Sequence, residues 1–285
     1  MCLNTFRGME RRRFLLALAA GLAGAAVGRG TIGEPDPPPA PVAQPRAAAA
    51  VSAVEAPPRS APLLPPTGVV QALPGDGTSL ALTIDDGTNS EVVAAFTEFA
   101  ADSGTRLTFF PNGCYRSWEE NADALGPLIE SGQVALGNHT WSHPDLTTLD
   151  DRAVAEEISR NREFMRKVFG VDDSPFFRPP FGARDERIDR ISAAEGHPTV
   201  AMWDGTLEDH RVLTPAQLMD AARKWFAAQR IIVGHANHVT VTTVYSELLD
   251  LIAELDLTTV TLADVWATPA QALRGRRVGG SAVVV

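Results

Sequence analysis

The chain has 285 residues, 45% of them hydrophobic and 21% charged, which is enough for one large domain or two small ones. Its formal net charge at pH 7 is −10, and because the first 66 residues are basic, residues 67–285 hold 18 basic and 31 acidic side chains, a net charge of −13. A body this acidic lacks the basic surface that nucleic-acid binding requires, so we expect no nucleic-acid partner.

Residues 1–29 are typical of an export signal. Three arginines, Arg11 to Arg13, precede Phe14 and an Ala-, Gly- and Leu-rich run that ends at Val27. That run is shorter than the roughly 20 apolar residues of a membrane span, and paired arginines before Phe-Leu favour the twin-arginine type. We therefore expect an exported protein of the cell envelope or extracellular space. The alternative is an uncleaved N-terminal anchor, which would be its only attachment to a membrane.

Residues 30–66 are dense in proline and alanine and poor in large apolar side chains. Such a segment cannot bury enough surface to offset the entropy lost on ordering, so we interpret it as an extended linker. At the other end, residues 271–285 are interpreted as a flexible tail. The folded domain is predicted to span residues 67–270.

Within this domain, short β-type runs alternate with segments of helical periodicity. Strands are predicted at Leu80–Ile84, Leu107–Phe110, Val134–Gly137, Pro175–Phe177, Thr199–Trp203, Arg230–Val233 and Thr258–Leu262. Helices are predicted at Val92–Ala101, Ala122–Ile129, Arg152–Val168, Arg187–Ala194, Pro215–Ala228 and Thr243–Leu255. This alternation indicates an α/β fold with a parallel sheet, and about seven units favour a barrel.

Polar residues follow the predicted strands at their carboxyl ends, where the active sites of β/α barrels lie. These residues are Asp85, Asp86, His139, His143, Arg178, Asp204, Asp209 and His235. We expect them to meet at one end of the barrel, which predicts the active site there.

His139 and His143 are four residues apart, so on a helix or tight turn both imidazoles can bind one metal ion. Asp86 can supply a third ligand, which leaves coordination positions open, and Asp85 can then act as a base. The alternatives are a simple Asp-Asp-Gly turn and a pair of surface histidines. Together the three residues predict a metal-assisted hydrolase.

Arg178 stands in the proline-rich stretch Phe177-Arg178-Pro179-Pro180-Phe181-Gly182, whose rigid backbone can direct the guanidinium inward to hold a carboxylate ionised. His235 follows an apolar strand, where it is either a general acid or a core histidine with one partner. His197, which precedes Pro198, is predicted to be solvated. Cys114 is interpreted as apolar filler rather than a reactive thiol.

In this order the motifs resemble those of the polysaccharide deacetylases of carbohydrate esterase family four, over about residues 80–266. The motifs are Thr83-Ile84-Asp85-Asp86-Gly87, His139-Thr140-Trp141-Ser142-His143, Arg178-Pro179-Pro180-Phe181, the segment from Trp203 to His210, and Val233-Gly234-His235. The resemblance implies a distorted (β/α)7 barrel that removes acetyl groups from N-acetylated sugars. It also implies a divalent metal, most commonly Zn²⁺, with Co²⁺, Ni²⁺ and Mn²⁺ as alternatives.

The same resemblance implies a role for each site residue. Asp86, His139 and His143 would bind the metal. Asp85 would be the base that takes a proton from water, oriented by Arg178. His235 would protonate the leaving amine, and Asp209 would tune its pKa. The backbone N–H of Phe181 would stabilise the oxyanion together with the metal.

The chain departs from the family pattern around the acetyl pocket. His210 stands where the family usually has Trp, Val233 replaces the usual Leu, Phe181 replaces a Tyr, and Thr206 replaces an acidic residue. The metal and acid–base residues are retained, so these departures concern the identity of the substrate rather than catalysis.

Together these observations predict an exported, metal-dependent deacetylase whose partner is an acetylated glycan of the cell envelope or extracellular space. One alternative is an O-acetyl esterase acting on a polysaccharide such as xylan, since the same site hydrolyses esters. Another is a non-catalytic carbohydrate-binding barrel, which the changed Trp and Leu positions would suit. The oligomeric state does not follow from the sequence.

Overall fold

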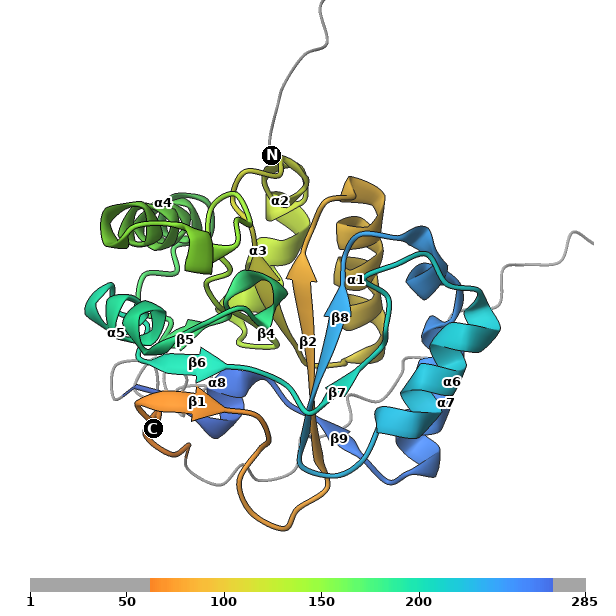
Figure 1. Ribbon diagram of the computed structural model, residues 1–285. Coiled ribbons are helices and arrows are strands. Elements are labelled where there is room, and N and C mark those ends of the chain that lie inside the picture. Colours follow the sequence, from red (N-terminus) through yellow and green to blue (C-terminus); the bar gives the residue numbers. More distant parts are fainter. Residues whose placement is uncertain (1–61, 269–285) are drawn as a thin grey trace, which may run out of the picture. The chain divides into compact units, whose positions relative to one another are not determined.

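The computed structural model describes residues 62–268, and the strand β2 (Ser79–Asp86) lies at its centre (Figure 1). β2 pairs in parallel with β3 (Leu107–Pro111) on one side and with β8 (Arg230–His235) on the other. The strand order of the whole sheet is β4-β3-β2-β8-β7, and β9 pairs with the first two residues of β2. These three further strands are β4 (Val134–Leu136), β7 (Gly205–Thr206) and β9 (Thr258–Thr259).

A second parallel sheet has the order β1-β6-β5. Its strands are β1 (Gly68–Val70), β5 (Phe176–Phe177) and β6 (Thr199–Ala201). A parallel bridge between Asn138 and Phe177 joins the segment after β4 to β5, so the pairing continues from one sheet to the other. The predicted α/β fold, a distorted (β/α)7 barrel, is confirmed.

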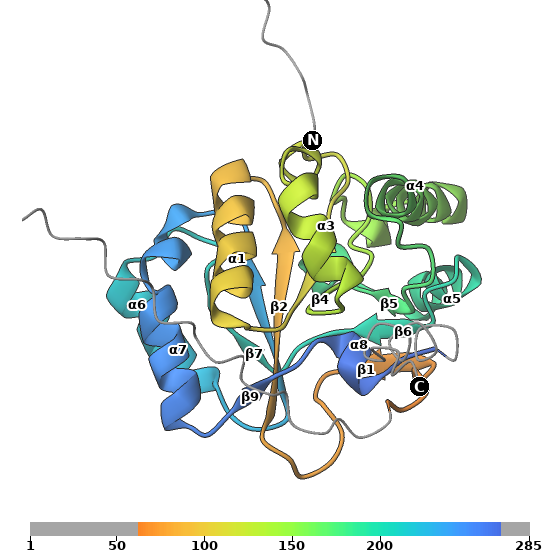
Figure 2. The same cartoon turned by 180° about the vertical axis from the view of Figure 1, so that it is seen from behind.

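Helices cover the outside of the strands. In both views α1 lies against β2, α6 and α7 lie on one side of it, and α4 and α5 lie on the other (Figures 1 and 2). The helices are α1 (Ser90–Ser103), α2 (Ser117–Glu120), α3 (Ala122–Glu130), α4 (Asp151–Phe169), α5 (Glu186–Ala194), α6 (Pro215–Trp225), α7 (Tyr245–Glu254) and α8 (Leu262–Val265). Three short 3₁₀ helices are η1 (Leu146–Thr148), η2 (Pro180–Gly182) and η3 (Val239–Thr243).

The alternation of side chains along β2 decides which of them can reach the site. Leu80, Leu82 and Ile84 join the apolar cluster beneath α1, whereas Ala81 joins a cluster with Phe110 and Ile231 on the opposite face. Because side chains of a strand alternate between faces, Thr83 and Asp85 share the face of Ala81. The first carboxylate of the motif is thereby directed toward the other sheet, where Arg178 lies.

Most predicted elements are confirmed within a few residues. The predicted strand at Thr258–Leu262 is wrong in its second half, because Thr261 caps α8, which begins at Leu262. β1 and β7 are absent from the prediction, since three and two residues are too few to show a period.

The predicted export signal or anchor (1–29), the tail (271–285) and nearly all of the linker (30–66) lie outside the described residues. Among residues 62–268, no helix has the length and apolar character needed to span a membrane.

Candidate active site

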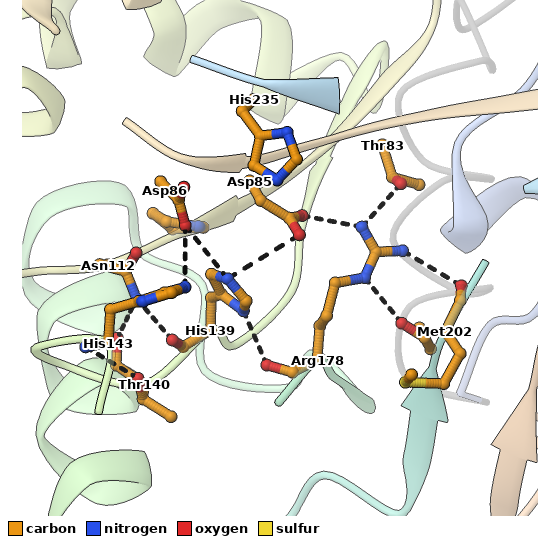
Figure 3. A network of polar contacts seen from close by, with 12 residues as sticks. Thr83, Asp85, Asp86, Asn112, His139, Thr140, His143, Arg178, Met202 and His235 are labelled. Atoms are coloured by element: carbon orange, nitrogen blue, oxygen red, sulfur yellow. Dashed lines mark hydrogen bonds and ion pairs between the residues drawn. The ribbon is translucent and has the colours of Figure 1, made fainter. Parts of the chain in front are cut away.

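β2 ends in a turn that gives two adjacent carboxylates different surroundings. Asp86 and Gly87 have positive φ angles of 69° and 88°, and a Cβ added at Gly87 would lie 2.4 Å from the Trp118 ring. The Trp118 indole N–H donates to the Asp86 carbonyl oxygen over 2.9 Å. After this turn Asp85 contacts Arg178, whereas Asp86 lies against His139 and His143 (Figure 3).

Asp86, His139 and His143 form a cluster that can hold a metal ion. Each offers one ligand atom, and the three atoms lie within 4.8 Å of one another. The Nε2 atoms of His139 and His143 are 3.2 and 3.3 Å from Asp86 Oδ1. Both histidines lie in the loop between β4 and η1, which is a tight turn with a positive φ of 58° at His143. The spacing of four residues therefore acts through a turn rather than a helix.

The hydrogen bonds of His139 determine which ring nitrogen faces the cluster. Its Nδ1 lies 2.7 Å from the carbonyl oxygen of Arg178, and since a carbonyl can only accept, Nδ1 carries the hydrogen. Nε2 is therefore the ring nitrogen directed at Asp86 Oδ1, a buried oxygen without a hydrogen-bond partner among the described residues. A metal-binding histidine typically has this arrangement, in which one ring N–H donates to a backbone carbonyl and the other nitrogen faces the ion. The residues present therefore fit a divalent metal ion.

The pKa shifts of His143 and Asp86 also fit a metal site. Burial lowers the pKa of His143 to about 4, and the neighbouring His139 adds to this effect, so the imidazole is neutral at neutral pH. Burial alone would raise the pKa of Asp86, but its contacts with the His139 and His143 imidazoles outweigh burial and hold the pKa below its ordinary value. One carboxylate and two imidazoles form a donor set suited to metals of the zinc type.

Arg178 is fully buried and holds Asp85 in place. Its Nη1 donates to Asp85 Oδ1 and to Thr83 Oγ1, each over 2.7 Å, and its Nε donates to the Ala201 carbonyl over 2.7 Å. The guanidinium also lies over the Phe110 ring, 4.2 Å from its centroid. Burial lowers the pKa of Arg178, and the negative charge of Asp85 opposes this shift. The geometry brings together the base and the arginine predicted to orient it.

His235 lies beside Asp85, because the two residues are register partners at the ends of β8 and β2. His235 contacts Asp209 through two nitrogen atoms. Its Nδ1 is 2.9 Å from Asp209 Oδ1, and its backbone N–H donates to Asp209 Oδ2 over 3.0 Å. Burial alone would lower the pKa of His235, but the hydrogen bond and charge of Asp209, with contributions from Asp85 and Asp86, raise it to about 9. The protonated imidazole is thus stabilised, as the predicted role of general acid requires.

Replacing Asp209 with Asn is expected to shift the alkaline limb of the pH profile of kcat/KM to lower pH. A general acid works only while protonated, so activity is present below the pKa of His235 and is lost as pH rises through it. Loss of a carboxylate partner at 2.9 Å should lower that pKa by about 1–3 units. A bound cation lowers the pKa in both proteins, so we compare the two profiles measured with the same metal. Coincident alkaline limbs would contradict the assigned role of Asp209.

The predicted substrate-contacting residues lie at different depths. Phe181 is 71% exposed, has a φ of 60°, and its ring centroid is 4.5 Å from that of His143. His210 is exposed, with its ring centroid 6.2 Å from that of His235. Val233 is buried within β8, two residues before His235 and on the same face. All three adjoin the site, Phe181 and His210 at its rim and Val233 beneath it.

Asp204 does not belong to the site, contrary to the sequence prediction. Its Oδ1 accepts a hydrogen bond from the backbone N–H of Ile231, and its Oδ2 lies 3.5 Å from Arg230 Nη1. Both contacts are at the beginning of β8, whereas His235 is at the end of that strand. The chain between β6 and β7 carries Asp204 to the opposite end of β8.

The prediction that His197 is solvated is also wrong. His197 is buried, its Nδ1 donates to the carbonyl oxygen of Ser174 over 2.8 Å, and its Nε2 accepts from Asn138 Nδ2 over 2.9 Å. Asn138 Oδ1 in turn accepts from the N–H of Thr140, inside the loop that carries His139 and His143. Burial lowers the pKa of His197 to about 4, despite the hydrogen bond to Ser174.

This burial predicts a specific loss of stability in acid. The neutral imidazole is favoured in the folded state, so between pH 6.5 and about 4 the unfolded chain binds the proton first. The contribution of His197 to the free energy of unfolding is therefore fully present above pH 6.5. About 3 kcal/mol of it is lost as the pH falls from 6.5 to about 4. Urea unfolding of metal-free wild type and His197→Gln from pH 7 to 4 measures it. The difference in unfolding free energy should shrink toward low pH, and a constant difference would refute the effect.

Several residues that support the site were not predicted from the sequence. Asn112 Nδ2 donates to the carbonyl oxygen of His139 over 2.5 Å, and Glu157 accepts hydrogen bonds from the N–H and hydroxyl of Ser142. Asn237 Nδ2 donates to Asp86 Oδ2 over 2.6 Å. The sequence holds one usable signal, because Asn112 directly follows an apolar strand and Asn237 lies two residues after another, but polar residues are also ordinary in such loops.

The sequence profile of the family described as "Polysaccharide deacetylase" matches residues 73–200. A chitin deacetylase of Arthroderma benhamiae is 26% identical over 205 residues, which cover 68% of this chain and 55% of that protein. The chain spans 24–48% of the length of three further curated relatives that it matches.

Among solved structures, the peptidoglycan N-acetylglucosamine deacetylase Bc1960 has a TM-score of 0.63 at 19% identity, over 71% of this chain and 94% of that one. A protein of Bacillus anthracis called a CE4 family pseudoenzyme has a TM-score of 0.62 at 17% identity, over 70% of this chain and 69% of its own. The shared fold therefore accompanies both active and inactive sites, so the residues of the site itself must support any activity.

Proposed function

The chain belongs to the polysaccharide deacetylase family, and we propose that it is a metal-dependent hydrolase that removes acetyl groups from the N-acetylated sugars of a glycan. One observation carries this proposal: buried Asp86 Oδ1 has no hydrogen-bond partner among the described residues and faces the Nε2 atoms of His139 and His143. A second carboxylate, that of Asp85, lies beside the cluster, with Oδ2 3.8 Å from His139 Nε2.

The residues around the cluster can carry out the proton transfers of amide hydrolysis. A divalent ion held by Asp86, His139 and His143 would polarise the acetyl carbonyl and make a nearby water more acidic. Asp85, held in place by Arg178, accepts a proton from the attacking water. His235 donates a proton to the sugar nitrogen as the C–N bond breaks, which yields acetate and a free amine. The backbone N–H of Phe181, a residue whose ring lies against that of His143, would help stabilise the oxyanion.

Zinc is our proposed metal, because a donor set of two imidazoles and one carboxylate is usual for catalytic zinc. Co²⁺, Ni²⁺ and Mn²⁺ accept the same ligands. For the substrate we propose a glycan of the cell envelope or extracellular space. The export-type sequence of residues 1–29 supports that choice. The net charge of −13 over residues 67–285 supports it too, since an acidic domain suits neutral or amino sugars better than nucleic acid.

Acetate release from a panel of acetylated glycans tests the function. Purified protein is assayed on chitin oligomers, peptidoglycan and acetylated xylan, after chelation and again with Zn²⁺ or Co²⁺ restored. We expect release from an N-acetylated glycan that depends on the metal. Activity confined to xylan and tolerant of His235→Ala would indicate an O-acetyl esterase, because an ester leaving group needs less protonation. Glycan binding without any acetate release would indicate a non-catalytic barrel.

A further inference from the structure

We propose that Asn237 is a positioning residue that decides which oxygen of Asp86 faces the metal, and that it thereby sets the affinity of the site for divalent cations. This role rests on the metal-dependent function proposed above. Asn237 lies two residues beyond His235 and outside the five motifs that the chain shares with its family.

The two oxygens of Asp86 have different partners. Oδ2 accepts a hydrogen bond from Asn237 Nδ2 over 2.6 Å. Oδ1 has no hydrogen-bond partner among the described residues and faces the two imidazole nitrogens. The amide therefore occupies one oxygen and leaves the other for the ion. Asp86 is prepared to act as a ligand through a single oxygen.

The orientation of the Asn237 amide is itself determined by its neighbours. Thr88 donates to Asn237 Oδ1 from both its backbone N–H, over 3.1 Å, and its hydroxyl, over 2.8 Å. Two donors on this side require the carbonyl oxygen there, so the NH₂ group must point to Asp86 Oδ2. A flipped amide would place donor against donor at Thr88 and acceptor against acceptor at Asp86.

Backbone hydrogen bonds hold Asn237 close to Thr88 and Asp86. The N–H of Ala236 donates to the Asp85 carbonyl oxygen over 3.0 Å, and the N–H of Asn89 donates to the Ala236 carbonyl oxygen over 3.2 Å. Through Ala236, the residue before Asn237, the segment after β8 is thus joined to both sides of the turn that carries Asp86 and Thr88. Little conformational freedom remains to be lost when the metal binds, which favours tight binding.

Removing the amide has two consequences for Asp86. The carboxylate loses the contact that holds its plane, and Oδ2 becomes free to approach the ion as a second ligand oxygen. Loss of an outer partner of a metal ligand typically weakens metal binding 10–100-fold. Asn237 should therefore affect metal affinity directly, whereas a residue with a merely structural role would change only the stability of the fold.

Metal affinity of the full chain tests this role. The Kd for Zn²⁺ is measured by competition with a chromophoric chelator for wild type, Asn237→Ala and Asn237→Leu, the last of which keeps the side-chain volume. We expect the Kd to rise about 10–100-fold in both variants. With Co²⁺ as the probe, the visible absorption bands should weaken, because a second oxygen from Asp86 raises the coordination number. Circular dichroism of each variant confirms that it is folded.

Two comparisons separate the outcomes. The matched control is Asn121→Ala, which removes an amide that donates to the carbonyl oxygens of Ser90 and Ser117 and should leave the Kd unchanged. Wild-type affinity in both Asn237 variants, with binding lost in Asp86→Ala, would overturn the role of Asn237 and leave the proposed function standing. Failure of the wild type to bind metal, or full binding by Asp86→Ala, would overturn both.

Discussion

Replacing Asp85 with Asn is expected to lower kcat/KM for acetate release by about 10²–10⁴-fold, the usual contribution of a general base. The amide keeps an oxygen that can accept from Arg178 Nη1, but it cannot take a proton from water. Metal content should remain at the wild-type level, since Asp85 is not one of the three ligand residues. Steady-state kinetics and metal analysis on the same preparation measure both quantities.

Asp204→Asn is the matched control for this substitution. It makes the same chemical change in an aspartate of the same domain, but at the beginning of β8, where the new amide oxygen can still accept from the N–H of Ile231. We expect wild-type kinetics from this control. Undiminished turnover in Asp85→Asn, or an equal loss in both variants, would refute the assignment of Asp85 as the base.

The second large effect is expected at Asp86, the carboxylate of the proposed metal site. Asp86→Ala removes the carboxylate whose buried Oδ1 faces both imidazoles, so it should abolish metal binding at micromolar concentrations and reduce acetate release to background. The loss of affinity should exceed the roughly 10–100-fold expected for loss of an outer partner. Inductively coupled plasma analysis of the purified variant and a chelator-competition titration measure the two effects.

Reconstitution provides the control for metal dependence. Wild-type protein stripped by a chelator should regain activity when Zn²⁺ or Co²⁺ is added, whereas Asp86→Ala should not. Wild-type protein that stays fully active after exhaustive chelation would show that the cluster of Asp86, His139 and His143 is not a catalytic metal site. It would also remove the physical basis for the proposed deacetylase.

The arrangement of the barrel was largely predictable because it depends on local patterns. The apolar run Leu80–Ile84 forms the central strand β2, and the periodic segment Arg152–Val168 is nearly the whole of α4. Where a pattern is too short, as in the two residues of β7, pairing with β8 creates the strand, and no local signal exists. The turn after β2 was suggested by Gly87, but its exact shape depends on Trp118, 31 residues farther along the chain.

The sequence by itself determined the residues that can carry the chemistry: two adjacent aspartates, two histidines four apart, an arginine among prolines and a histidine after an apolar strand. Only the tertiary structure decided how they are used. It placed Asn237 against Asp86, buried His197 against Asn138 and carried Asp204 away from the site. The reason is physical, since the type and spacing of residues determine what a site can bind, whereas the partner of each polar atom depends on contacts between segments far apart in the chain.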